Sequence, residues 1–392
     1  MWPKFSQKSV NIDFQPLHDE TEGRCLPAER TPSPFKRLLN LLAIAIQCIL
    51  LIAIVFKLTR IAYILYSKGS VQQDQYAMEG ITDGKDRYAL MFEDFIVSYA
   101  KSYASDEEKE FRFSIFVDNV KYYEEYERRN PGVDLDVTKF ADWTEEEMIR
   151  YVSRNLREMQ FDGPRFEGSP RLDFERPPEM DWTKQGKLTP VKDQGQCGSC
   201  WAFATVASVE AAYAIKTGNL TRLSEQEMID CDSQNSGCQG GYRPFAMNFV
   251  KQNGLMKEDE YPYRGNDHNQ CLLKKDAERV FIKSHTMLST NEEVIASWIA
   301  TNGPATFGMN VTKSMYSYRS GIFSPSQEEC EAHSLGSHAL TLVGYGTESG
   351  QAYWLVKNSW GSRWGQNGYF QLARGQNSCG VANTVVGPVM GN

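Results

Sequence analysis

Residues 194–216, QGQCGSCWAFATVASVEAAYAIK, decide the fold of the second half of this chain. A glycine-punctuated loop runs into the almost wholly apolar segment 201–215, which leaves no polar face for water and therefore predicts a buried helix that ends at Gly218. Cys200 stands in the first turn of this helix, where the positive end of the helix dipole lowers the pKa of a thiol and favours the reactive thiolate. The alternative is a cysteine of the core or of a disulfide. Cys197 is the better disulfide candidate, because the small residues after it keep the approach to Cys200 open.

The cysteines are spread unevenly over the 392 residues, a length that suffices for two or three domains. Two of them, Cys25 and Cys48, precede residue 50, and seven follow residue 190. Seven clustered cysteines predict three disulfides and one free thiol in an oxidising compartment, and the free thiol is the candidate nucleophile. The net charge of −8 provides no basic surface, so nucleic-acid binding is not expected. No motif indicates a metal site or a cofactor.

The N-terminal part of the chain predicts a membrane anchor. Residues 1–37 are polar and rich in proline, which is typical of a disordered tail. Residues 38–56 carry no charge and have the length of a membrane-spanning helix, which the apolar run 61–66 extends; the alternative is a buried core helix. Because the cysteine-rich half requires an oxidising compartment, we expect a signal-anchor over 38–66 with a cytosolic tail. Two glycosylation sequons fit this orientation, at Asn219 and Asn310.

The rest of the chain divides into four segments. A linker over 67–85 precedes a helical domain over 86–150, in which Ser105 or Asp106 caps the second helix. Residues 151–177 contain arginines and prolines without apolar periodicity and predict an exposed, cleavable linker. From residue 178 onward, helical patterns come first and strand patterns later, which favours an α+β fold with two lobes.

Within this last domain, local patterns set the expected elements. A capping box of Ser224 and Glu227 predicts a short helix, and Thr290 with Glu293 predicts another. Pro244 and Gly254 fit the first turn and the end of a third helix. Short, largely apolar segments predict strands over 306–311, 339–345, 353–358 and 368–372.

A cysteine nucleophile needs a base that takes its proton and a group that orients this base. His338 directly precedes a predicted strand, which is a rigid place for an imidazole, and Asn358 ends the next strand. The other histidines lie in the tail or in loop-like contexts. We therefore expect Cys200 on the helical lobe to face His338 on the strand lobe across a cleft.

Four motifs, QGQCGSCWAF, GCQGGY, SHALTLVGYG and VKNSWGSRWGQNGYF, resemble those of the papain family of cysteine proteases, close to its cathepsin L and F branch. The resemblance implies a papain-like two-lobed fold, with a helical left lobe and a β-barrel-like right lobe. It implies Cys200 as nucleophile, His338 as base and Asn358 as its orienting residue. Gln194 and the Cys200 backbone N–H would form the oxyanion hole, and Trp360 would shield the His–Asn hydrogen bond.

The resemblance also implies disulfides and a substrate cleft. Spacing alone leaves fifteen pairings open for six cysteines, whereas the family implies Cys197–Cys238, Cys231–Cys271 and Cys330–Cys379. The implied substrate-binding residues are Gly240, Gly241, Tyr242, Arg243, Gly308, Ala339, Trp360 and Thr384. Arg243 is unusual in the pocket for the second residue before the scissile bond. We expect its side chain to point to solvent; the alternative is that the pocket accepts acidic or polar residues.

The helical domain upstream resembles the inhibitory propeptide of the same family. The matching positions are Glu108, Arg112, Phe116, Asn119, Phe140 and Asp142, and the departures are Tyr123, Glu127, Asp136 and Thr138. The alternative is a domain that serves packing alone. The short distance from Cys271 to His338 leaves no room for the insertion of a dipeptide-removing enzyme, so an endopeptidase is expected.

The sequence thus predicts a type II membrane-anchored zymogen that is inhibited by its propeptide and released by cleavage at roughly 160–178, and the family resemblance implies activation at low pH. The mature enzyme would be lysosomal, endosomal or extracellular. Its expected partners are protein and peptide substrates, its own propeptide and cystatin-type inhibitors. The competing interpretations are a catalytically silent binding protein with the papain fold and a membrane scaffold.

Overall fold

The computed structural model describes residues 84–152, 165–168, 176–267, 270–274 and 276–391. The predicted tail (1–37) and membrane anchor (38–66) lie outside the described residues, as do Cys25, Cys48 and most of the predicted linker 151–177. In the described part of the chain, no helix combines the length and the apolar character that crossing a membrane requires.

The first described module is built on two long helices and one short helix. Ser105 caps the second helix by accepting from the Glu108 N–H (3.2 Å), and acidic residues fill its first turn, where they complement the helix dipole. Phe92 and Phe116 join the two long helices through their rings, with centroids 5.2 Å apart. The elements are α2 (Gly84–Tyr99), α3 (Asp106–Arg129), β1 (Val133–Leu135) and α4 (Glu145–Tyr151).

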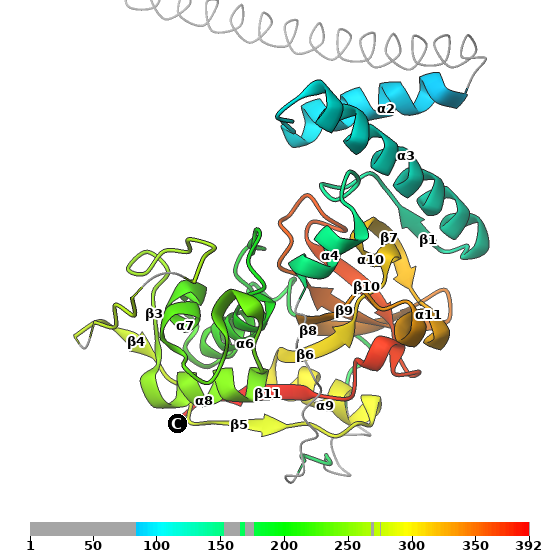
Figure 1. The fold of residues 1–392 in the computed structure, drawn as a ribbon. Helices are drawn as coiled ribbons and strands as arrows, with labels where there is room; N and C mark the ends of the chain where they lie inside the picture. The colour runs from blue at the N-terminus through cyan, green and yellow to red at the C-terminus, as the bar shows by residue number, and fades with distance from the viewer. Residues whose placement is uncertain (1–83, 153–164, 169–175, 268–269, 275, 392) are drawn as a thin grey trace, which may run out of the picture. The chain divides into compact units, whose positions relative to one another are not determined.

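The second module begins with a helical side, drawn in green in Figure 1. Its central helix α6 (Cys200–Thr217) is buried over most of its length and ends at Gly218 in a left-handed conformation, which confirms the predicted buried helix. Ser224 caps α7 as predicted, but the Glu227 side chain accepts from the Met256 N–H instead of closing the capping box. The remaining elements of this side are α7 (Glu225–Cys231), η1 (Gly237–Gln239), α8 (Arg243–Asn253), β3 (Leu255–Met256) and β4 (Arg279–Val280).

The other side of this module is a large, mostly antiparallel sheet, whose strands β5 to β11 are drawn from yellow to red in Figure 1. Its strands follow the order β1-β7-β10-β9-β8-β6-β11-β5, and β2 pairs with β8. All four predicted strands are present, with ends within three residues of those expected. The strands are β2 (Met180–Asp181), β5 (Ser284–Met287), β6 (Ala305–Asn310), β7 (Tyr318–Phe323), β8 (Ser337–Glu348), β9 (Gln351–Lys357), β10 (Tyr369–Ala373) and β11 (Val385–Val389).

Four short helical elements connect these strands. The helix predicted to begin at Thr290 is capped instead by Asn291, whose side chain accepts from the Glu293 N–H (2.9 Å). Both residues are competent caps, and the structure uses the one that lies nearer to the helix. The elements are α9 (Glu292–Asn302), α10 (Lys313–Tyr316), α11 (Gln327–Ala332) and η2 (Ser378–Gly380).

Two contacts bring the parts of the future site together. Helix α6 packs on β8, and the Thr341 hydroxyl donates to the Ala204 carbonyl at 3.2 Å. Strand β1 of the first module pairs antiparallel with β7 of the second, with Val133 opposite Gly321, and so extends the sheet by main-chain hydrogen bonds. Among the described cysteines there are three disulfides, the same pairs that the resemblance implied: Cys197–Cys238, Cys231–Cys271 and Cys330–Cys379.

Candidate active site

Cys200 is the free cysteine among the described residues, and it is completely buried at the first turn of α6. The backbone N–H of Ala339 on β8 and the N–H groups of the thiol's own helix turn favour its charged form and so act to lower its pKa. The thiol of the helical side therefore lies near the strand side, at the residue next to His338.

His338 and Asn358 lie side by side because β8 and β9 are antiparallel neighbours. His338 is the second residue of β8, and Asn358 directly follows β9. The His338 Nε2 and Asn358 Oδ1 atoms are 2.8 Å apart, and the same Oδ1 accepts from the Ser359 N–H at 2.8 Å. This second contact identifies the amide atom as the oxygen, so His338 donates through Nε2–H and its Nδ1 carries the lone pair.

Trp360 lies over the imidazole of His338, with ring centroids 4.8 Å apart in a stacked arrangement. It also contacts the rings of Phe140 and Tyr151, which belong to the first module, at 5.2 and 5.8 Å. The indole thus separates the imidazole from solvent, and the first module covers the indole in turn.

Gln194 is fully buried beside the thiol. Its side-chain oxygen accepts from the Ser359 hydroxyl (2.7 Å), so its Nε2 points the other way. Nε2 donates to the Cys197 carbonyl (3.0 Å) and to the Tyr151 carbonyl (3.3 Å). The first module therefore places a backbone carbonyl on the donor that the sequence assigned to the oxyanion hole. No pattern in the sequence singled out Tyr151.

Burial governs the protonation of the thiol and the imidazole. It raises the pKa of the Cys200 thiol, although the Ala339 N–H and the positive charge of Arg243 act in the opposite direction. Burial also lowers the pKa of the His338 imidazole to about 4, against the stabilising bond to Asn358. The expectation of a lowered thiol pKa is therefore wrong for this form of the protein. The reason is that desolvation by burial outweighs the N–H groups at the helix terminus.

The structure shows the surroundings of several residues predicted to bind substrate, and one of them differs from the expectation. Gly241 lies against the Trp201 ring so closely that a Cβ atom would stand 2.4 Å from it. Gly308 faces Ala339 across β6 and β8. Arg243, expected to point to solvent, is only 4% exposed, and its Nη2 donates to the Thr384 carbonyl at 3.3 Å.

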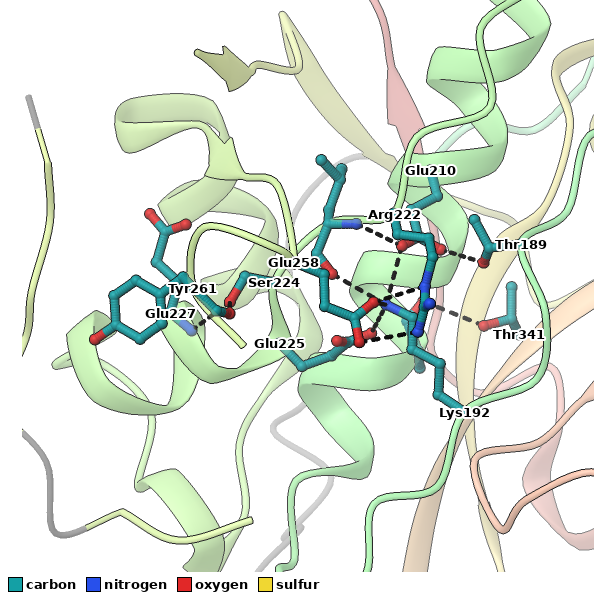
Figure 2. Close-up of polar contacts among 12 residues, drawn as sticks. Thr189, Lys192, Glu210, Arg222, Ser224, Glu225, Glu227, Glu258, Tyr261 and Thr341 are labelled. Carbon is teal, nitrogen blue, oxygen red and sulfur yellow. Dashed lines mark hydrogen bonds and ion pairs between the residues drawn. The ribbon is translucent and has the colours of Figure 1, made fainter. Parts of the chain in front are cut away.

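An ionic network that is buried at Glu210 and Glu225, largely buried at Lys192 and exposed at Arg222 lies beside helix α6 (Figure 2). Lys192 contacts the carboxylates of Glu210 (3.1 Å), Glu225 (2.7 Å) and Glu258 (3.1 Å). Arg222 also pairs with Glu258, at 2.8 Å. The sequence analysis did not identify this network. The one available signal was Glu210, the single charged residue in the apolar segment 201–215.

The network holds more carboxylates than cations near its centre, and this changes the pKa values there. Burial and the neighbouring carboxylates raise the pKa of Glu225 to about 7 despite the contact with Lys192. Burial lowers the pKa of Lys357, which donates to the Thr189 carbonyl at 2.7 Å, to about 8. Both groups therefore titrate near neutral pH, directly behind Asn358.

The two predicted sequons differ in accessibility. Asn219 is exposed after the end of α6. Asn310 is half-buried on β6, its Nδ2 donates to the Cys330 carbonyl (3.1 Å), and the sequon residue Thr312 is only 1% exposed.

A helix-borne thiol beside a strand-borne imidazole, with a separate helical module laid over both, is the arrangement of a cysteine protease made as an inactive precursor. Residues 176–389 match the family model of the papain family cysteine proteases, and residues 92–148 match that of the cathepsin propeptide inhibitor domain (I29). This chain belongs to the papain family of cysteine proteases.

Relatives and solved structures agree with this assignment. Cathepsin F of Mus musculus is 38% identical over 308 residues, which cover 78% of this chain and 66% of the relative. Pro-cathepsin H of Bos taurus is 36% identical over 308 residues, which cover 76% of this chain and 89% of the relative. Two solved precursor structures match over their full lengths. The recombinant stem bromelain precursor matches 78% of this chain, with a TM-score of 0.71 and 32% identity. Procathepsin L2 from Tenebrio molitor larval midgut matches 77% of this chain, with a TM-score of 0.70 and 33% identity.

The protein is therefore a papain-fold hydrolase preceded by an inhibitor-type propeptide. Its partners include peptide or protein substrates and its own propeptide.

Proposed function

We propose that the mature protein is an endopeptidase that works through Cys200, His338 and Asn358. The observation that carries this proposal is the hydrogen bond from His338 Nε2–H to Asn358 Oδ1. It commits one ring nitrogen to the amide and leaves Nδ1 as the base. Within the described residues, this buried Nδ1 has no hydrogen-bond partner, and the thiol of Cys200 lies against the residue that follows His338.

In the proposed reaction, His338 Nδ1 takes the proton of the Cys200 thiol, and the thiolate sulfur attacks the carbonyl carbon of the scissile bond. The resulting oxyanion accepts from the Gln194 side-chain amide and the Cys200 backbone N–H. Collapse of this intermediate breaks the C–N bond, and His338 gives its proton to the leaving amine. Water, deprotonated by the same imidazole, then hydrolyses the thioester and releases the acid.

Asn358 acts by keeping the imidazole in the productive tautomer. An amide oxygen at Nε2 holds the proton there in the neutral ring and accepts from the imidazolium that forms during the reaction. Trp360 supports this role because its ring stacks on the face of the His338 imidazole. Replacement of Asn358 by Ala is expected to lower kcat more than it raises KM.

We further propose that the segment 86–150, together with Tyr151, inhibits the enzyme directly. Strand β1 extends the enzyme's sheet at β7, and the Tyr316 hydroxyl donates to the Met148 carbonyl at 2.7 Å. The Tyr151 carbonyl meets the Gln194 amide where a substrate's oxyanion would form. These contacts support a propeptide that occupies the catalytic groups as well as blocking access to them.

For the cellular form, we propose a type II precursor with residues 38–66 as the membrane anchor and residues 1–37 in the cytosol. Cleavage at roughly 160–178 would release the mature enzyme into a lysosomal, endosomal or extracellular space. The three disulfides among the described residues favour the secretory pathway, because disulfides form and persist in an oxidising compartment. Cystatin-type inhibitors would bind the cleft that the propeptide vacates.

The proposed function is tested with an epoxide or vinyl-sulfone probe for cysteine proteases on the processed protein. A covalent adduct on Cys200 is expected, absent in Cys200→Ala and strongly reduced in His338→Ala. Cleavage of an internally quenched peptide away from its ends is expected in parallel. Folded, processed protein that neither takes up the probe nor cleaves peptides would favour the catalytically silent alternative.

A further inference from the structure

Arg243 occupies an unusual place for a permanently charged side chain. It is the first residue of α8 and is almost completely buried, at 4% exposure. Arginine keeps its charge at any pH that proteins experience, so burial does not neutralise it as it does a lysine or a carboxyl group. A buried guanidinium therefore brings a fixed positive charge to whatever surface it faces.

The guanidinium faces Gly308 on strand β6. A Cβ atom at Gly308 would lie only 2.7 Å from Nη1 and 2.8 Å from Nη2, so the absence of a side chain there is what gives the guanidinium its space. On its other side, Nη2 donates to the carbonyl of Thr384, the residue before β11. The charge is thus held between two strand segments rather than on a mobile side chain.

This position lies one strand away from the nucleophile. Gly308 pairs directly with Ala339 across the antiparallel strands β6 and β8, where facing Cα atoms are about 4.5–5.5 Å apart. The N–H of Ala339 in turn lies close enough to the Cys200 thiol to favour its charged form. An extended peptide advances by about 3.3 Å per residue, so a substrate held along these strands would bring a side chain one or two residues from the attacked carbonyl towards the guanidinium.

The surroundings make this charge the distinguishing feature of the pocket. The other residues assigned to it, Tyr242, Gly308, Ala339 and Thr384, carry no charge. A planar guanidinium binds a carboxylate through two parallel hydrogen bonds, which a neutral amide of the same shape cannot reproduce. We infer that Arg243 is a specificity-determining residue, and that it makes the enzyme prefer peptides with glutamate or aspartate at the second position before the scissile bond. This inference rests on the proposed peptidase function.

The test compares peptides that differ at that second position only, with Glu, Gln or Leu, on the processed enzyme. We expect kcat/KM at pH 6 for Glu to exceed that for the isosteric Gln by roughly tenfold or more, as for other hydrogen bonds between charged groups. The Glu/Gln ratio should fall towards one as the pH drops below about 4.3, because the substrate carboxylate is then protonated. In Arg243→Met, Leu should become the best residue and the preference for Glu should disappear. Arg243→Lys should keep part of it.

A purely structural role of Arg243, as a link between α8 and Thr384, predicts a different result. In that case Arg243→Met lowers thermal stability and all kcat/KM values together and leaves the Glu/Gln ratio unchanged, which would overturn the inference. A wild-type ratio near one at pH 6 would also overturn it, even if the variants fail to fold. Absence of cleavage of every peptide, together with absence of probe labelling at Cys200, would instead contradict the proposed function.

Discussion

Tyr151 allows the proposed inhibition to be tested with two substitutions of opposite effect. Its side chain is 2% exposed and contacts the rings of Phe140 (5.1 Å), Trp143 (5.3 Å) and Trp360 (5.8 Å). Only Trp360 belongs to the enzyme. Within the described residues, the buried Tyr151 hydroxyl has no hydrogen-bond partner. The ring therefore favours the closed zymogen, whereas the hydroxyl opposes it.

The magnitude follows from these contacts. Truncation of a buried aromatic residue to Ala costs about 3–5 kcal/mol. Because the contacts with Phe140 and Trp143 lie within the propeptide and persist when it lifts away, we assign about half of this cost to closure. Tyr151→Ala should then increase the fraction of open zymogen by roughly 10- to 70-fold. In Tyr151→Phe the unsatisfied hydroxyl is gone, which should stabilise the closed form by about 1–3 kcal/mol.

The assay is the rate at which an epoxide probe labels Cys200 in the intact zymogen at pH 7, where the open fraction limits the reaction. We expect faster labelling than wild type for Tyr151→Ala and slower labelling for Tyr151→Phe, with both variants folded by thermal melting. Equal rates for wild type and Tyr151→Ala would refute the argument that the ring holds the site closed. Faster labelling of Tyr151→Phe would refute the assignment of the hydroxyl as an unsatisfied group.

Three further predictions concern pH and glycosylation. The Arg112 guanidinium lowers the pKa of Glu147 in the folded propeptide, so the pair stabilises the fold above the unfolded-state pKa of Glu147, and this stabilisation is lost as the pH falls through the folded-state pKa. Glu147→Gln should lower the free energy of unfolding of the propeptide by about 1 kcal/mol at pH 7. On gels, this variant should be processed at a higher pH than wild type, whereas the control Glu146→Gln should not. The pKa of Glu225 is raised to about 7 in the folded protein, so the folded state binds this proton more tightly than the unfolded state does. The resulting stabilisation is complete below the unfolded-state pKa of about 4.3 and is lost as the pH rises through about 7. The melting temperature of the wild type should therefore fall between about pH 5 and 8, and that of Glu225→Gln should fall less. Asn219→Gln should remove one glycosidase-sensitive band shift, whereas Asn310→Gln should leave the pattern unchanged because the Asn310 amide is engaged with the Cys330 carbonyl.

The sequence predicted those elements whose pattern is set locally. The apolar run after Cys200 permits no orientation other than burial, and the helix observed there matches the expected one from its first turn to Gly218. Strands β8 and β9 were predicted from their apolar residues, and antiparallel pairing then suffices to bring His338 and Asn358 together. Where two neighbours are equally able to cap a helix, as Thr290 and Asn291 are, the local pattern does not decide, and the prediction missed by one residue.

What the sequence did not predict depends on partners that lie far away along the chain. Arg243 was expected in solvent because arginine usually is, but a glycine on β6 leaves room for its guanidinium inside the protein. Glu227 was expected to close its own capping box, but its carboxylate binds Arg279 and the Met256 N–H instead. In both cases, a charged side chain found a distant partner that local propensity does not encode.

The state of the thiol and imidazole links the propeptide to the chemistry it controls. A thiolate and an imidazolium are both charged, so each is favoured only where water or fixed dipoles solvate it. In the zymogen, Tyr151 and Phe140 cover the site, the pKa of Cys200 is raised and that of His338 is lowered, so the pair stays neutral. In the proposed mechanism, removal of the propeptide therefore does more than open a path for substrate. It would return solvent to the two groups, free the Gln194 amide from the Tyr151 carbonyl and let the helix terminus and the Ala339 N–H favour the thiolate.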